Sequence, residues 1–221
     1  LMMIAKRGGS QECLEILVDR GAEMDLVDEE GRTALYWAVA EGYIDIVASL
    51  LDKGAQPNIS ERDGITPLQI ACITGSTFVA QRYLDFGVDV NAVDNQGFSA
   101  LHYVVSPCRE STIQLLLRNK ADPLLQDPNG RTPLHIMIGS TANTYLTRYF
   151  GYSMVNLLIE HMSTLDTPDI NGDTALHIAI QKDDLNCVEL LLAAGADKNV
   201  INKAGQSLLD LAKSIDGDVL E

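Results

Sequence analysis

Three of the four histidines share a local sequence, and imidazole is the side chain best suited to acid–base catalysis or metal binding near neutral pH. His102, His135 and His177 each stand three residues after a serine or threonine and directly after a leucine. Tyr36 and Gln69 occupy the same place in two further copies of this pattern. Replacement by tyrosine and glutamine within one chain fits neither catalysis nor metal ligation, so a structural role is expected.

No other combination of residues suggests a catalytic site. There is no glycine-rich phosphate loop, no HExxH and no GxSxG, and His161 stands alone on a predicted helix end. The chain is therefore predicted not to be an enzyme, with no catalytic residue, no metal and no cofactor.

The four cysteines are scattered without a CxxC pair, which predicts neither a disulfide framework nor a zinc site and favours a reducing compartment. They are Cys13, Cys72, Cys108 and Cys187. Cys13 and Cys187 each precede an apolar helical stripe and are expected to be small buried hydrophobes.

Glycines mark a repeat of 33 residues that is interrupted once. Two residues after each glycine comes a serine or threonine, and two residues further comes a leucine. The glycine suits a tight turn that needs positive φ, the hydroxyl can cap a helix, and Pro67 or Pro133 fits the first helical position. The glycines are Gly31, Gly64, Gly97, Gly130, Gly172 and Gly205, spaced by 33, 33, 33, 42 and 33 residues.

This unit, with "GRTPLHIMI" at 130–138 and "GDTALHIAI" at 172–180, resembles the ankyrin repeat over nearly the whole chain. The resemblance implies an all-α solenoid of stacked helix pairs with β-hairpin fingers, in which the recurring histidine bonds backbone groups and braces neighbouring hairpins. We expect a single domain over 1–221 with five full repeats and two partial ones. Their bounds are about 1–27 (partial), 28–60, 61–93, 94–126, 127–168 with a nine-residue insert, 169–201 and 202–221 (partial).

The first segment, "LMMIAKRGG", aligns with a first helix already under way, without its hairpin. A solenoid needs a polar outer cap, which Leu1, Met2, Met3 and Ile4 would not provide, so more chain upstream is expected. "GQSLLDLAKS" (205–214) is similar to the shortened closing repeat of such arrays.

The net charge of −15 argues against nucleic acid and against docking on anionic lipid, because both need a lysine and arginine footprint. The acids gather in 23–30 and 160–197. They either keep the surface soluble or attract basic partner segments. No apolar run is long enough to cross a bilayer and no signal segment is present, so a cytoplasmic, monomeric fragment without direct membrane insertion is expected.

The resemblance implies a protein-interaction scaffold that binds a partner segment, with basic and apolar residues, in the concave groove. The alternatives are a regulatory or substrate-recruiting module of a larger enzyme, or the cytosolic domain of a channel. The resemblance places candidate partner-binding residues at the hairpin tips: Glu29, Glu30, Arg32, Arg62, Asp63, Ile65, Gln96, Phe98 and Arg131, together with Asn95, Asn129, Asn171 and Asp173.

Ile65 and Phe98 are apolar where a turn normally carries a polar residue. They could anchor a partner within a charged rim, or each could merely cover a neighbour's backbone. Trp37 and Tyr103, one position after the recurring histidine, could be core or groove residues.

The insert falls within 139–153, between the two helices of one repeat. Its aromatic residues are Tyr145, Tyr149, Phe150 and Tyr152, which either fold back over helices of the domain or form a second docking site. We expect both helices to be extended, with a helical stretch starting at Ser140 or Thr141, a break at Gly151, and Ser153 capping the next helix.

One modification is implied by the resemblance. "LDFGVDVN" (84–91) places Asn91 in the arrangement that an oxygen-sensing asparaginyl hydroxylase often modifies in ankyrin repeats. Asn58 and Asn199 are weaker matches. Asn91 could equally serve only to close its hairpin.

Overall fold

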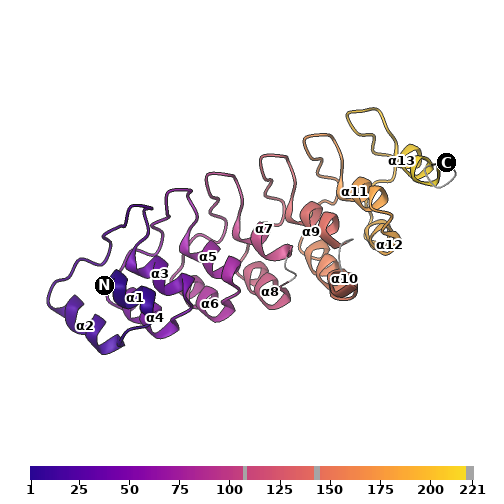
Figure 1. Cartoon of the computed structure of the whole chain (residues 1–221). Helices are drawn as coiled ribbons and strands as arrows, with labels where there is room; N and C mark the ends of the chain where they lie inside the picture. The colour runs from indigo at the N-terminus through magenta and orange to yellow at the C-terminus, as the bar shows by residue number, and fades with distance from the viewer. Residues whose placement is uncertain (107–108, 142–144, 218–221) are drawn as a thin grey trace. The chain divides into compact units, whose positions relative to one another are not determined.

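The protein, seen in a computed structural model, is a succession of short helices joined by loops (Figure 1). The structure describes the backbone of residues 1–106, 109–141 and 145–217, and the side chains of these except 141, 145–150 and 214–217. The helices are α1 (Met2–Arg7), α2 (Gln11–Asp19), α3 (Ala34–Ala40), α4 (Ile44–Asp52), α5 (Pro67–Thr74), α6 (Thr77–Asp85), α7 (Ala100–Val105), α8 (Glu110–Arg118), α9 (Pro133–Thr141), α10 (Tyr145–Ile159), α11 (Ala175–Gln181), α12 (Leu185–Ala193) and α13 (Leu208–Gly217).

The fold is all-helical, as expected. Within the described ranges, the hairpin fingers are loops whose β pairing is limited to two isolated antiparallel bridges, Val93 with Ser99 and Ile201 with Ser207. The chain divides into two compact units. Unit 1 is Leu1–Val104 with Arg118–Ala121, and unit 2 is Val105–Leu117 with Asp122–Glu221.

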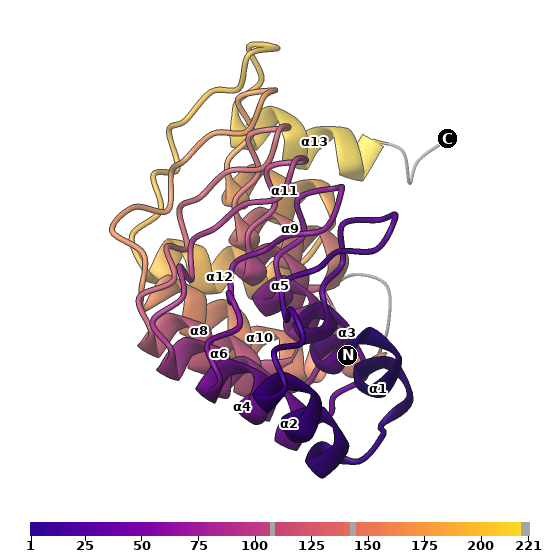
Figure 2. The ribbon, with the colours of Figure 1, turned by 90° about the vertical axis from the view of Figure 1, so that its left-hand side faces the viewer.

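In unit 1 the first helices of successive repeats pack on one another, and so do the second helices. Thus α3 packs between α1 and α5, while α4 packs between α2 and α6 (Figure 2). Fully buried alanines at Ala38 and Ala71 let the helices approach closely, and Leu35, Leu50 and Tyr83 fill the core between them. The hairpin loops of this unit project to the same side of the helices.

Unit 2 uses the same arrangement. Here α11 packs between α9 and α13 and also on its own partner α12, which in turn contacts α10. Leu134, Met137, Ile138, Met154 and Leu158 are fully buried between them.

The recurring glycines serve the turn and a close approach together. Gly64 has φ +81°, and a Cβ there would lie 2.8 Å from the backbone nitrogen of Asn95 in the next hairpin. Gly172, also at φ +81°, would place a Cβ 2.7 Å from the nitrogen of Lys203. Any side chain at these two positions would therefore force neighbouring hairpins apart.

Five of the six hairpins are shaped by an aspartate or asparagine three residues before the glycine, a role that the spacing of the glycines does not reveal. Asp94 Oδ1 accepts the backbone N–H groups of Gln96 at 2.9 Å and Phe98 at 3.0 Å. The same pair of bonds is made by Asp28, Asp127, Asp169 and Asn202. Because these loops have almost no sheet pairing, the side-chain oxygen satisfies donors that would otherwise lack partners.

Within each unit, every pair of neighbouring hairpins is joined by one backbone bond. In unit 1 the Asn95 nitrogen donates to the Asp63 carbonyl at 3.0 Å, and in unit 2 the Lys203 nitrogen donates to the Asn171 carbonyl at 2.9 Å. The donor always stands two residues before the glycine. In the hairpin of Gly130 that position is Pro128, which has no N–H to give.

His135 and Gln69 brace hairpins in the way the resemblance implies, whereas the buried Nε2 of His177 has no hydrogen-bond partner among the described residues. His135 Nδ1 accepts from the Thr132 hydroxyl at 2.8 Å, and its Nε2 donates to the Asp173 carbonyl of the next hairpin at 3.2 Å. In unit 1, Gln69 does the same work, since its Nε2 donates to the carbonyls of Ala92 at 3.1 Å and Phe98 at 2.7 Å.

The insert lengthens the second helix of its repeat, but not as expected in detail. Helix α10 has 15 residues against nine in α4, α6, α8 and α12, and it runs unbroken through Gly151 and Ser153. Gly151 is buried, and packing holds a helix together through a glycine that costs about 1 kcal/mol. Ser140 and Thr141 end α9 rather than begin a helix, and Ser140 donates back to the Met137 carbonyl at 2.8 Å.

The cysteine prediction was wrong at one position. Cys187 is fully buried, but Cys13 is exposed. Helix α2 packs on α4 in the layer of second helices and buries only Leu14 fully, so its other side chains stay accessible. Cys108 lies outside the described residues.

We predict that stability falls as the pH is lowered from 7 to 5. Burial lowers the pKa of both His135 and His177 below the ordinary value of 6.5. Below that pH the unfolded chain binds protons that the folded chain resists, so the free energy of unfolding declines as the pH falls. Urea unfolding followed by circular dichroism at several pH values measures this decline.

Glutamine in the same position supplies the control. His135→Gln should keep the brace, as Gln69 does, and reduce the pH dependence, whereas His135→Ala should cost about 1–3 kcal/mol at pH 7. His161→Gln changes an exposed histidine and should leave the profile as it was. A pH slope that is the same in wild type and His135→Gln would show that this imidazole does not carry the effect.

Candidate functional site

A partly exposed stripe runs along the first helices, one position after the histidine. Every member of this stripe is half-buried. In unit 1 it consists of Trp37, Ile70 and Tyr103, and in unit 2 of Ile136 and Ile178. The two aromatic members stand out in the sequence, whereas the isoleucines are identified only by the register that all five share.

Trp37 ties its helix to its hairpin. The indole Nε1 donates to Asp28 Oδ2 at 3.1 Å, the Lys6 Nζ lies 3.8 Å from the ring centroid, and the Arg32 Cζ lies 4.4 Å from it. Two cations close to one indole ring favour this arrangement through the ring quadrupole. Burial acts to raise the pKa of Asp28, but the hydrogen bonds from Arg32 and Trp37 outweigh it and hold the pKa below its usual value.

Tyr103 repeats this connection in the last hairpin of unit 1. Its hydroxyl donates to Asp94 Oδ2, and burial together with that bond raises the pKa of Tyr103. The Phe98 ring lies 5.7 Å from the centroids of both Tyr103 and His102, edge-on to the histidine. Phe98 thus covers its own repeat with part of its surface while the rest stays accessible.

The middle hairpin of unit 1 departs from the others. Glu61 stands where they carry an aspartate or asparagine, and burial and the charge of Asp63 raise its pKa. Ile65 in this hairpin is half-buried, while Arg62 and Asp63 are exposed. With Glu29 and Glu30 exposed in the preceding hairpin, acids outnumber bases at these tips.

Two of the candidate arginines bind their own hairpins. Arg32 Nε lies 3.0 Å from Asp28 Oδ2, and the Arg131 guanidinium lies 2.7 Å from Asp127 Oδ2, which is fully buried. Their charges are therefore largely matched, and they offer a partner the outer edge of a guanidinium rather than a free cation.

The remaining tip residues divide by exposure. Gln96, Asn95, Asn129 and Asn171 are exposed. Asp173 is buried, and its two carboxylate oxygens accept from Asn202 at 2.9 Å and Gln181 at 3.2 Å. It belongs to the support of its hairpin.

The described part of the chain holds neither a cluster of metal-ligating side chains nor an apolar helix of membrane length. No group of three or more histidine, cysteine, aspartate or glutamate side chains there is arranged to hold a metal ion. None of the helices described is both long and apolar enough to cross a membrane.

The fold and its recurring contacts define an ankyrin-repeat protein, and the chain belongs to that family. Residues 1–61, 57–127 and 108–202 each match the family described as ankyrin repeats in three copies. Folds of this family are typically non-catalytic interaction modules.

Among curated proteins, the chain is 35% identical over 99 residues to the nuclear factor NF-kappa-B p105 subunit of Rattus norvegicus, covering 45% of this chain and 10% of that protein. It is 32% identical over 117 residues to neurogenic locus notch homolog protein 1 of Xenopus laevis, covering 52% of this chain and 4% of that protein. It is 30% identical over 120 residues to the target of rapamycin complex 2 subunit AVO2 of Saccharomyces cerevisiae, covering 52% of this chain and 26% of that protein. The matched region is thus a small part of each relative.

Two solved structures share the fold over almost the whole chain. The ankyrin repeat domain of Bcl-3, described as a unique member of the IkappaB protein family, superposes with a TM-score of 0.84 at 27% identity, covering 96% of this chain and 92% of that one. The human ASB11 ankyrin repeat domain gives a TM-score of 0.76 at 27% identity, with coverage of 96% and 90%.

We predict that Trp37→Phe weakens unit 1 by about 1 kcal/mol, because phenylalanine keeps a ring in place but loses the N–H donated to Asp28. Urea unfolding followed by circular dichroism measures the loss. Gln96→Ala, at an exposed tip, serves as the control and should change stability by less than about 0.5 kcal/mol. Equal stability of Trp37→Phe and wild type would mean that the indole bond contributes nothing.

Proposed function

We propose that this chain is a non-catalytic scaffold that binds a segment of a partner protein on the tip surface of unit 1. The tip surface comprises the half-buried stripe Trp37, Ile70 and Tyr103 with the hairpin residues beside it. The observation that carries the proposal is an apolar stripe beside tips whose exposed charge is mainly acidic. The partner segment would carry apolar side chains for the stripe and basic ones for Glu29, Glu30 and Asp63.

Family membership supports this proposal in general terms, because ankyrin-repeat domains generally mediate protein–protein interaction. The contacts of the tips support it in particular. Hairpins held by paired side-chain and backbone bonds form a pre-ordered surface, so a partner binds without the entropic cost of ordering loops. Ile65 and Phe98 would supply apolar contact at the edge of the stripe, with Gln96 and Arg62 next to them.

The placement of the domain in a cell and in a longer protein is part of the same proposal. We place it in the cytoplasm, where cysteines without disulfide spacing stay reduced. It could serve as the recruiting module of a larger enzyme or as the cytosolic part of a channel, since the chain matches only a small part of its curated relatives.

For the insert, we propose that its aromatic side chains pack on unit 2 rather than dock a second partner. Tyr152 supports this, because its hydroxyl donates to Asp184 Oδ1 at 3.0 Å and burial raises its pKa. Asp184 in turn accepts the Cys187 N–H at the start of α12. The side chains of Tyr145, Tyr149 and Phe150 lie outside the described residues.

We predict that the double substitution Ile65→Ala with Phe98→Ala lowers the affinity for a partner captured by the tip surface at least about tenfold. A loss of this size is expected when apolar anchors are truncated. The partner is isolated by affinity capture and its dissociation constant is then measured with purified protein. Phe86→Ala removes a ring from the end of α6 and should leave the affinity unchanged. A partner that binds both Ala variants as it binds wild type does not use this surface.

The same partner tests the acidic tips. Its association rate should fall steeply between low and physiological salt while its dissociation rate changes little, because surface charge acts mainly on encounter. Replacing Glu29, Glu30 and Asp63 by their amides should remove most of that salt dependence. An association rate that ignores salt in wild type would contradict electrostatic steering.

We also propose Asn91 as a site of hydroxylation. Its backbone N–H donates to Asp89 Oδ1 at 2.9 Å and its side-chain amide donates to the Lys120 carbonyl at 3.3 Å, and the residue is half-buried in the loop after α6. The amide therefore closes its loop whether or not the Cβ is modified.

Incubation with an asparaginyl hydroxylase followed by peptide mass spectrometry should show one added oxygen on Asn91. Asn58 and Asn199, in weaker matches, should gain less. An unmodified Asn91 under conditions that modify another ankyrin-repeat substrate would discard the proposal.

A further inference from the structure

The second helices of five repeats have the same length and the same register. The residue at their second position is polar in all of them except α6. Helices α2, α4, α6, α8 and α12 each contain nine residues. Their second residue is polar in four cases and phenylalanine in α6, where Phe78 is 82% exposed. The four polar residues are Glu12, Asp45, Ser111 and Asn186.

Nothing in the packing of α6 calls for an apolar side chain at this position. The following residues, Val79 and Ala80, are 2% and 0% exposed and supply the buried contact of the first turn. An acidic residue here, such as Asp45 in α4, would stabilise the helix by interacting with the positive end of its dipole. Phe78 does not provide this stabilisation. A single exposed ring is common on protein surfaces, but Phe78 shares a hollow with the exposed Ile44, and a contiguous exposed apolar patch marks an interaction site.

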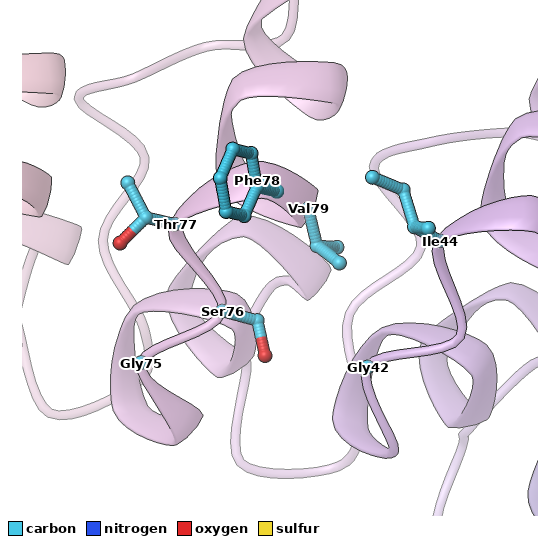
Figure 3. A pocket seen from close by; sticks show the side chains of 7 residues that line it. All are labelled: Gly42, Ile44, Gly75, Ser76, Thr77, Phe78 and Val79. Carbon is cyan, nitrogen blue, oxygen red and sulfur yellow. The ribbon is translucent and has the colours of Figure 1, made fainter.

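Phe78 borders a hollow on unit 1 at the turns between first and second helices (Figure 3). The hollow has a volume of about 510 Å³, and Ile44 from one repeat and Phe78 and Val79 from the next face it. Ile44 is 41% exposed. Gly42 lines the hollow at φ +77°, a backbone conformation that favours glycine.

This hollow is separate from the tip surface. The turns that form it follow the ends of α3 and α5, whereas the hairpins precede the starts of the same helices. A ligand in the hollow therefore lies at the opposite helix ends from the tips of the same two repeats.

The charge around the hollow is acidic. Glu41 precedes Gly42 and Asp45 follows Ile44, and both are exposed. The cation closest in sequence, Arg82 on the turn after Phe78, already lies 3.1 Å from Asp52 and 5.0 Å from the Phe86 ring. Two exposed carboxylates are thus adjacent in sequence to Gly42 and Ile44, which line the hollow.

We propose that the hollow beside Phe78 is a second docking site, which binds a short basic amphipathic segment of a partner protein. An aliphatic or aromatic side chain of the segment would enter between Ile44 and Phe78, and a neighbouring lysine or arginine would reach Glu41 and Asp45. A second copy of this chain is a poor occupant, because two chains of net charge −15 would bring acidic rims together.

The test uses the whole 221-residue chain and three designed peptides. The first is a 15-residue helical peptide with leucine at every third or fourth position and lysine elsewhere. In the second, glutamate replaces lysine, and in the third, alanine replaces leucine. Titration calorimetry should show binding of the first peptide only, and the methyl resonances of Ile44 should shift on binding.

Phe78→Asp is the decisive variant, because it installs the residue type of α4 at an exposed position. The variant should fold with unchanged or greater stability. Its affinity for the lysine peptide should be at least about tenfold lower, although the added negative charge favours a basic ligand. Ile65→Ala with Phe98→Ala should leave this binding unchanged, which separates the hollow from the tip surface.

Four results would overturn the proposal. The first is a lysine peptide that binds Phe78→Asp as it binds wild type, and the second is a glutamate peptide that binds equally well. The third is destabilisation by Phe78→Asp as large as that by Val79→Asp, which would make Phe78 a packing residue. Sedimentation of wild type as a dimer, lost in Phe78→Asp, would assign the hollow to self-association instead.

Discussion

The hairpins depend on a single side-chain oxygen that accepts two backbone N–H groups. In Asp28, Asp94, Asp127 and Asp169 this oxygen replaces the sheet pairing that the loops lack, and the second oxygen is left for another donor. That donor decides what each tip is attached to. For Asp94 it is the Tyr103 hydroxyl on the first helix, and for Asp127 it is the arginine of the same hairpin. The second oxygen of Asp28 accepts from both the Trp37 indole and Arg32. The position of the tips on each unit follows from these bonds.

The fold was predictable because its constraints repeat. Glycine, hydroxyl cap and leucine recur in one register, and the Thr66–Gln69 capping box shows the expected cap. The leucine is buried in every copy but the last, where Leu209 is exposed. The insert was less predictable, because the local rules conflict with packing there. Gly151 and Ser153 would each break or cap an isolated helix, yet both lie within α10, where buried neighbours such as Met154 and Val155 hold the helix continuous.

The candidate site was predictable in position but not in detail. Register placed Phe98, Ile65 and the acids at the tips, while the pairing of Arg32 and Arg131 with their own aspartates depends on side-chain conformations that no spacing reveals. The isoleucines of the stripe were missed because isoleucine at a helical position suggests core. Only the comparison between repeats shows that the position is half-exposed in all of them, and the same comparison singles out Phe78.

The chain has one tryptophan, and Trp37 lies in unit 1. Its indole is half-buried between helix and hairpin, with two cations close to the ring, so its emission depends on the intactness of the first repeats alone. Unit 2 does not contribute to tryptophan emission, whereas the helices of both units contribute to the far-ultraviolet circular dichroism spectrum. The two optical signals therefore read different halves of the same molecule, and a gap between their transitions would measure how far one half can melt without the other.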